Sequence, residues 1–291
     1  MPGMGNATRS MQLDKRKLAS IPADVLRDKR IDSLSLFQNA LTELPDELWT
    51  LTALTSLNLG DNNIAWLPDA IGSLSKLRML DLGHNRLAAL PDAIGRLTAI
   101  SDYLYLSNNL LHAVPETLGN LTRLAYLNVS DNQLIALHGS IGDMKGLIEL
   151  RVYRNQLATL PDSICALAQL TEFHAQQNHL SFLPASIGNL SNLRELDLAD
   201  NKLTTLPSSI GNLAQLRRLN LRNNAITTLP RAMGDLRQLT HLDLRANPLR
   251  LLPDSIADMP ALEKLDLRWC RLEMVPGWVE RLIARGTVVY L

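Results

Sequence analysis

The sequence of 291 residues is poor in several features that other protein classes require. It has 2 cysteines, 4% aromatic residues, and 29 basic side chains that balance 29 acidic ones. Two cysteines cannot form a disulfide framework. A net charge of zero argues against a nucleic-acid-binding protein, which needs an excess of basic residues on one face. No run approaches 18 apolar residues, so we expect no segment inserted in a membrane.

The sequence does contain one unit that returns about every 23 residues. Beginning at Leu54, it reads LxxLxLxxNxIxxLPxxIGxLxx, and we number its positions from 1 to 23. Self-similarity at this period indicates a solenoid in which each coil packs on its neighbours. Eleven full units start at Ile31, Leu54, Leu77, Ile100, Leu124, Leu147, Leu170, Leu193, Leu216, Leu239 and Leu262.

Each recurring residue type has a physical role in such a coil. Apolar positions 4 and 6 flank a variable residue, as in a strand with one buried face, so we expect one parallel sheet. Position 9 is asparagine in ten units, from Asn39 to Asn247, and a buried asparagine can satisfy backbone groups where the chain turns. Proline at position 15 favours the start of a short helical turn.

The recurring residues at these positions divide the chain into four parts. We predict a polar N-terminal tail at residues 1–7, a degenerate capping coil at 8–30, the repeat units at 31–284, and a C-terminal edge strand at 285–291. An exposed last strand would leave an open sheet edge. We expect a monomer, and a dimer formed by pairing of two such edges is the alternative.

The unit that starts at Ile100 departs from the pattern because it has 24 residues. Ser101, Asp102 and Tyr103 occupy the space that two residues normally fill, which indicates a bulge. The bulge is either a tolerated local irregularity or a device that directs Tyr103 or Tyr105 toward a partner.

The pattern LxxLxLxxNxLxxLPxxIGxLxx, from about residue 8 to residue 291, resembles the leucine-rich repeat (LRR) family. It is most similar to the 23-residue units of intracellular Ras-group LRR scaffolds and of bacterial LRR proteins. The resemblance implies an α/β fold. It would be a curved right-handed solenoid with a parallel β-sheet on the concave face and short helical turns and loops on the convex face.

The resemblance also implies a function. We expect a non-enzymatic protein–protein interaction module, acting as a signalling scaffold or as a bacterial effector. The alternative is the sensor or targeting half of a larger system whose catalytic domain is on another chain or was truncated. The first twenty residues lack the apolar segment of a secretory signal, which predicts a cytoplasmic protein. A bacterial effector exported without a cleaved signal is the alternative.

No set of residues in the sequence points to catalysis, a metal or a cofactor. The six histidines fall at six different repeat positions, and the glycines are spaced by the repeat rather than as a phosphate loop. Cys165 and Cys270 lie five coils apart, which is too far for a disulfide. We therefore expect no catalytic residues, no metal ligands and no cofactor.

The side chains at positions 2, 3, 5, 7 and 8 are not needed to form the core. Their identities are therefore the best indication of function. In the central coils these positions bear tyrosine and arginine, which are enriched at binding hot spots. We predict that a protein partner binds the concave face there. The alternative is a solvated sheet face with incidental tyrosines. The candidate residues are Tyr105, Tyr126, Arg151, Tyr153, Arg154 and His174.

A secondary candidate patch lies in the C-terminal units. It comprises Arg218, Arg222, Arg245, Arg268 and Trp269. One interpretation is a dock for an acidic or phosphorylated peptide. We favour the other, an arginine–aspartate lattice that is satisfied between neighbouring strands.

Overall fold

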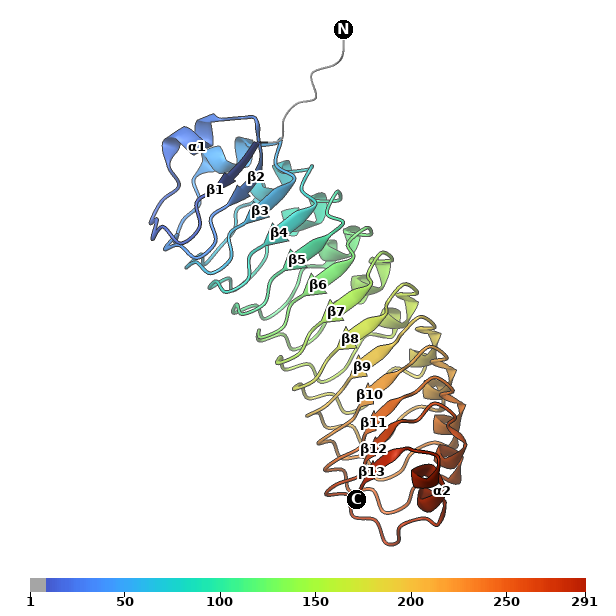
Figure 1. Ribbon diagram of the computed structural model, residues 1–291. Coiled ribbons are helices and arrows are strands. Elements are labelled where there is room, and N and C mark those ends of the chain that lie inside the picture. The colour runs from blue at the N-terminus through green and yellow to red at the C-terminus, as the bar shows by residue number, and fades with distance from the viewer. Residues whose placement is uncertain (1–8) are drawn as a thin grey trace.

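The computed structural model describes residues 9–291, and the tail predicted at 1–7 lies outside them. All of its strands are parallel and follow chain order in a single 13-stranded sheet, which Figure 1 shows as a continuous ladder. The strands are Arg9–Gln12 (β1), Ile31–Ser35 (β2), Ser56–Asn58 (β3), Met79–Asp81 (β4), Tyr103–Tyr105 (β5), Tyr126–Asn128 (β6), Glu149–Arg151 (β7), Glu172–His174 (β8), Glu195–Asp197 (β9), Arg218–Asn220 (β10), His241–Asp243 (β11), Lys264–Asp266 (β12) and Val288–Tyr290 (β13).

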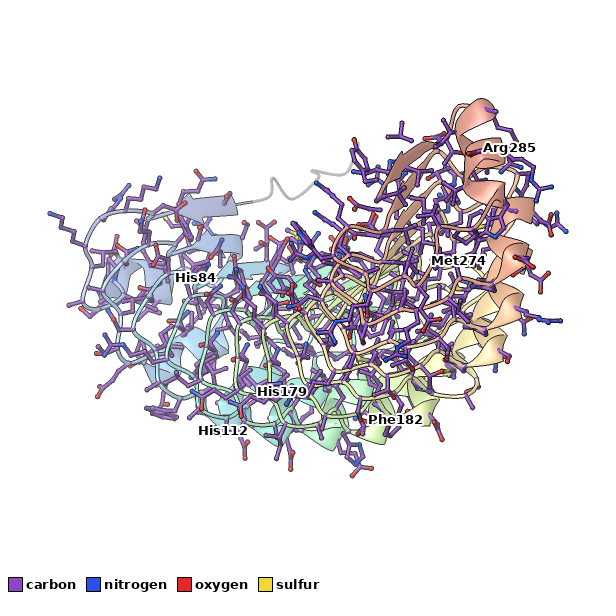
Figure 2. The ribbon with its side chains drawn as sticks, turned by 90° about the horizontal axis from the view of Figure 1, so that it is seen from below. His84, His112, His179, Phe182, Met274 and Arg285 are labelled. Carbon is purple, nitrogen blue, oxygen red and sulfur yellow. The ribbon has the colours of Figure 1, made fainter. Side chains whose placement is uncertain are left out.

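Short helices alternate with these strands. Two are α-helices, Ala23–Arg27 (α1) and Trp278–Ala284 (α2). Ten are 3₁₀ helices: Asp46–Thr50 (η1), Asp69–Ser73 (η2), Asp92–Arg96 (η3), Glu116–Asn120 (η4), Gly139–Asp143 (η5), Asp162–Ala166 (η6), Ile187–Asn189 (η7), Ser208–Asn212 (η8), Arg231–Asp235 (η9) and Asp254–Asp258 (η10). Figure 2 shows the curved ribbon with its strands inside and its helices outside. The predicted solenoid is therefore confirmed. None of the helices in residues 9–291 is long and apolar enough to cross a membrane.

An aliphatic core runs the length of the solenoid. The leucines of positions 4 and 6, such as Leu57 and Leu59, are at most 2% exposed. Phe173 fills one of these positions in β8 and is also fully buried. Burying each such side chain contributes about 1.5–3 kcal/mol. Because each strand is short, the packing of its buried side chains is what holds neighbouring coils together.

The asparagine ladder joins each coil to the one before it. Nδ2 of Asn155 donates to the carbonyl oxygens of Val129 and Val152, at 3.0 Å each, and Oδ1 accepts from the backbone amide of Leu134 at 3.0 Å. The ladder asparagine thus satisfies backbone groups of two successive coils at the turn that leaves the sheet. Cys270 takes this place in the last unit and donates its thiol to the Leu244 carbonyl oxygen.

The convex turns are narrow because neighbouring coils approach closely there. Pro161 precedes η6 in extended conformation, and Asp162 lies in its first turn, where a negative charge is favourable. A side chain at Gly142 would overlap the carbonyl oxygen of Ser163 in the next coil. Glu280 stands at the corresponding position of the last unit, where the turn widens into α2.

The extra residue in the unit from Ile100 lies just before its strand. The backbone amides of Ser101 and Asp102 both donate to the carbonyl oxygen of Arg78. Beyond this point the register is regular, and Tyr103 pairs with Met79 on one side and with Tyr126 on the other. The bulge therefore does not redirect the tyrosines of β5.

Candidate functional site

Positions 3 and 5 of each unit occupy the ends of its strand and project from the concave face, because positions 4 and 6 point into the core. Tyr103 and Tyr126 are at position 3 of adjacent coils, and Tyr105 is at position 5 between them. The parallel register therefore brings together aromatic residues that are far apart in the sequence. All three side chains are half-buried.

The three tyrosines form one cluster in the middle of the sheet. The ring centre of Tyr105 lies 4.9 Å from that of Tyr103 and 5.0 Å from that of Tyr126, with tilted planes. The guanidinium carbon of Arg151 lies 5.7 Å from the centre of the Tyr126 ring. Burial raises the pKa of the Tyr126 hydroxyl well above its usual range, so it stays protonated. Three predicted site residues thus meet, and Tyr103, which the site prediction omitted, completes the cluster.

Acidic side chains continue the concave face beyond the tyrosines. Glu149 is ion-paired with Arg151, and Oε2 of Glu172 lies 3.4 Å from Nε2 of His174. Glu149, Glu172 and His174 each bring one possible ligand atom within 4.8 Å of the others, a set that could hold a metal ion. Arg151 already neutralises one of these carboxylates. These glutamates were not among the predicted site residues, although position 3 is glutamate in three successive units.

Tyr153 and Arg154 lie at the rim of the face rather than on the strands. Arg154 adopts a left-handed backbone conformation with a φ of 50°. Its guanidinium pairs with Asp131 at 3.2 Å and donates to Oε1 of Gln177 at 2.6 Å. The predicted set therefore divides between a strand-borne group, which includes His174, and this rim pair.

The arginines of the secondary patch are paired with carboxylates. Nη1 of Arg218 lies 3.5 Å from Glu195, and Nη2 of Arg222 lies 2.8 Å from Asp200. Arg245 bridges Asp243 at 2.5 Å and Asp266 at 3.5 Å, and Arg268 contacts Asp266 at 2.7 Å. The pairs of Arg218 and Arg222 join neighbouring coils, as the lattice interpretation expects, whereas the shortest pairs of Arg245 and Arg268 lie within their own coils.

The carboxyl group of Asp266 shows how strongly the arginines of this lattice stabilise a buried negative charge. Its side chain is only 1% exposed. Burial raises the pKa of its carboxyl, but the hydrogen bonds and charges of Arg268 and Arg245 outweigh burial and hold the pKa below its usual value. Arg268 also lies 5.6 Å from the centre of the Trp269 ring and 4.9 Å from that of Tyr290. Trp269 itself is 71% exposed at the rim.

A hollow of about 210 Å³ lies on the concave face over β9–β12 and overlaps the secondary patch. Glu195, Arg218, His241 and Lys264 line it from position 3 of four successive strands, and Asp197 is among the lining residues of position 5. At position 3, acidic side chains in β7–β9 thus give way to basic ones in β10–β12. This gradient was not predicted, because the candidate residues were chosen for aromatic and arginine side chains and His174, without the charges at position 3.

Comparison with known proteins gives a family match over most of the chain. The family described as "Leucine-rich repeat region" matches residues 103–205 and 185–283, and "Leucine Rich Repeat" matches 53–74 and 76–97. No curated protein shows a significant match to this sequence.

Solved structures share the fold. A leucine-rich repeat protein of Leptospira interrogans is 25% identical with a TM-score of 0.70, over 98% of this chain and 96% of that one. An internalin of Listeria monocytogenes is 22% identical with a TM-score of 0.72, over 97% and 86%. The plant peptide hormone receptor RGFR1, solved in complex with RGF2, is 26% identical with a TM-score of 0.66, over 92% and 52%.

Proposed function

This chain belongs to the leucine-rich repeat family, and on that premise we propose that it is a non-enzymatic module that binds a partner protein on its concave face. The fold typically serves protein binding and is usually non-catalytic. The observation that carries the proposal is the cluster of Tyr103, Tyr105 and Tyr126 capped by Arg151 in the middle of the sheet. Tyrosine and arginine are the residue types enriched at binding hot spots.

The backbone supports this role by fixing the side chains before a partner arrives. Each strand is hydrogen-bonded in register to its neighbours, and the asparagine ladder holds the turns. Little conformational entropy is then lost on association, which favours affinity. The plant receptor RGFR1 is described with its peptide hormone bound, and a peptide or protein ligand is the corresponding expectation for this chain.

The same likeness supports a second candidate role. RGFR1 is a peptide hormone receptor, and by analogy the second candidate role is the sensor or targeting half of a larger system whose catalytic domain is on another chain or was truncated. Both roles use the same binding face. Scaffold or effector activity and a cytoplasmic location remain predictions from the sequence.

The experiment is affinity capture with paired baits. One bait is the unaltered chain, and a second carries Tyr126→Ala, Arg151→Glu and Tyr153→Ala. A control bait carries Arg123→Glu and Arg237→Glu, two exposed residues outside the strands. We expect a protein that the unaltered and control baits retain and the concave variant loses. A protein that the concave variant retains as well as the unaltered bait does would contradict the proposal.

A further inference from the structure

Four aspartates occupy position 5 of their units on the concave face, and they fall into two classes. Asp243 and Asp266 are each followed two residues later by an arginine of the same unit, Arg245 or Arg268, which pairs with them. Asp81 and Asp197 are followed instead by Gly83 and Ala199. Within residues 9–291, no basic side chain lies in ion-pair contact with either carboxylate; each accepts a backbone amide, at 2.9 Å from Gly83 and at 3.0 Å from Ala199.

Asp81 lies beside the aromatic cluster. It is the register partner of Tyr105, and Tyr103 belongs to the same adjacent strand. Gly60 and Gly83 flank its carboxylate without side chains; a Cβ at Gly60 would lie 3.0 Å from Oδ1. Burial raises the pKa of the Asp81 carboxyl, and the Gly83 amide and the charge of His84 offset this only in part. A negative charge is thus held here at a cost in free energy, next to two aromatic rings.

Asp197 lies in a second hollow, at the rim, that Tyr153, Gln176 and Arg222 also line. Oε1 of Gln176 is buried there and has no hydrogen-bond partner among the described residues. Burial raises the pKa of the Asp197 carboxyl, although Asn220, His174 and Arg222 act in the opposite direction. Arg154 and Arg222 line the same hollow, and Nε of Arg222 is also buried without a partner, but their guanidinium groups are paired with Asp131 and Asp200. Asp197 and Gln176 therefore offer two acceptors, one charged and one neutral, to a group that brings several donors.

We propose that the concave face binds an extended segment of the partner protein through two basic side chains, one at Asp81 beside Tyr103 and Tyr105 and the other at Asp197 beside Gln176. The proposal rests on the proposed function and specifies the partner's chemistry. Arginine fits both places because its guanidinium supplies five donors, binds carboxylates in a fork and stacks on aromatic rings. Asp243 and Asp266 cannot act in the same way because their own coils neutralise them.

The spacing of the two anchors sets the length of the segment. Asp81 and Asp197 are in β4 and β9, five coils apart, which is about 24 Å at ~4.8 Å per strand. An extended chain advances about 3.4 Å per residue. The two basic side chains should therefore be about seven residues apart.

The experiment uses a synthetic fluorescent peptide with arginines at its first and eighth residues, separated by uncharged residues. The comparison peptide has one arginine replaced by citrulline, which keeps the shape without the charge. We expect the two-arginine peptide to bind the unaltered chain at least tenfold more tightly, because the second contact is intramolecular. Asp81→Asn or Asp197→Asn should abolish that advantage. Asp243→Asn, which makes the same charge change in the same column, should leave it within twofold. Equal binding of the two peptides, or an equal loss in Asp243→Asn, would overturn the proposal.

The captured partner separates this proposal from the proposed function. If that partner binds the Asp81→Asn, Asp197→Asn double variant as tightly as the unaltered chain but loses the concave variant, the two-anchor proposal fails and the proposed function stands. If it also binds the concave variant normally, both fail. Loss of binding to the double variant, with an unchanged circular dichroism spectrum and melting temperature no lower than that of the unaltered chain, supports the two-anchor proposal.

Discussion

The guanidinium carbon of Arg151 lies 5.7 Å from the centre of the Tyr126 ring in the neighbouring strand, while its Nε donates to Glu149 in its own strand. The arginine is thus held between an aromatic face and a carboxylate before any partner binds. Cation–π contacts of this kind contribute about 0.5–1 kcal/mol at exposed sites. A residue fixed in this way loses little rotamer freedom on association, which suits it to recognition.

Truncation of Tyr126 should affect binding more than folding. Tyr126→Ala removes the ring that contacts both Tyr105 and Arg151, and we expect the affinity for the captured partner to fall by about 30-fold, a hot-spot loss of ~2 kcal/mol. The half-buried ring should contribute only about 1 kcal/mol to stability. Isothermal titration calorimetry and urea unfolding measure the two effects. Tyr126→Phe keeps the ring and should bind nearly normally; an equal loss in both variants would point to the hydroxyl instead.

Asp81 and Asp266 should respond to pH with opposite signs. The folded-state pKa of Asp81 is raised above its ordinary value of 3.8, so its ionisation destabilises the fold as pH rises through the raised pKa. Asp81→Asn should therefore stabilise the chain at pH 7, and the gain should vanish below about pH 3.8. The folded-state pKa of Asp266 is lowered, so its ionisation stabilises the fold above pH 3.8, and this contribution is lost as pH falls through the lowered pKa.

Urea midpoints at pH 7 and pH 3 measure both effects. At pH 7, Asp266→Asn should cost about 2 kcal/mol, the scale of a hydrogen bond to a charged group, and its cost should shrink at the lower pH. A destabilised Asp81→Asn variant at pH 7 would show that a cation already neutralises Asp81.

Asn155 should be far more important for stability than its polar character suggests. Its side chain bonds the carbonyl oxygens of Val129 and Val152 and the amide of Leu134. Asn155→Ala leaves these buried groups unsatisfied, and we expect a loss of about 3 kcal/mol in the free energy of unfolding, measured by urea denaturation. Gln156→Ala, at the exposed neighbouring position, is the control and should change stability by less than about 0.5 kcal/mol. Comparable losses in the two variants would refute the role assigned to the ladder.

Two glycines in η5 should tolerate a methyl group very differently. Gly142→Ala places Cβ against the backbone of Ser163 in the next coil, and overpacking of this kind costs about 1–3 kcal/mol. At Gly139 the nearest atom to an added Cβ is Oγ of Ser163 at 3.9 Å. Gly139→Ala should therefore be neutral or stabilising by up to about 1 kcal/mol, through lower entropy of the unfolded chain. Thermal denaturation compares the pair, and a stable Gly142→Ala variant would mean that adjacent turns are not in close contact.

The repeat made the architecture predictable. Leucine at positions 4 and 6, asparagine at 9 and proline at 15 each indicate one local feature of the coil. For example, the 3₁₀ helix η6 begins directly after Pro161, as proline at position 15 predicts. The α-helix α2 in the last unit was not predicted, because the repeat pattern indicates a short turn in every unit.

The concave face was predictable only in part. Tyr105, Tyr126 and Arg151 carry a compositional signal and do lie together. Asp81 and Asp266 are both aspartates at position 5, and the sequence distinguishes them only by the residue two positions later, Gly83 or Arg268. That the Arg268 side chain reaches the carboxylate, while Asp81 accepts only a backbone amide, is visible in the structure alone.

Site-specific photo-crosslinking tests the central claim most directly. A photoreactive phenylalanine analogue is placed at Tyr126 on the concave face or, in a matched variant, at Arg237 on the exposed turn after η9. Each variant is irradiated with the partner identified by paired capture. We expect a crosslinked product from position 126 and none from position 237. A product from position 237 alone would contradict binding on the concave face.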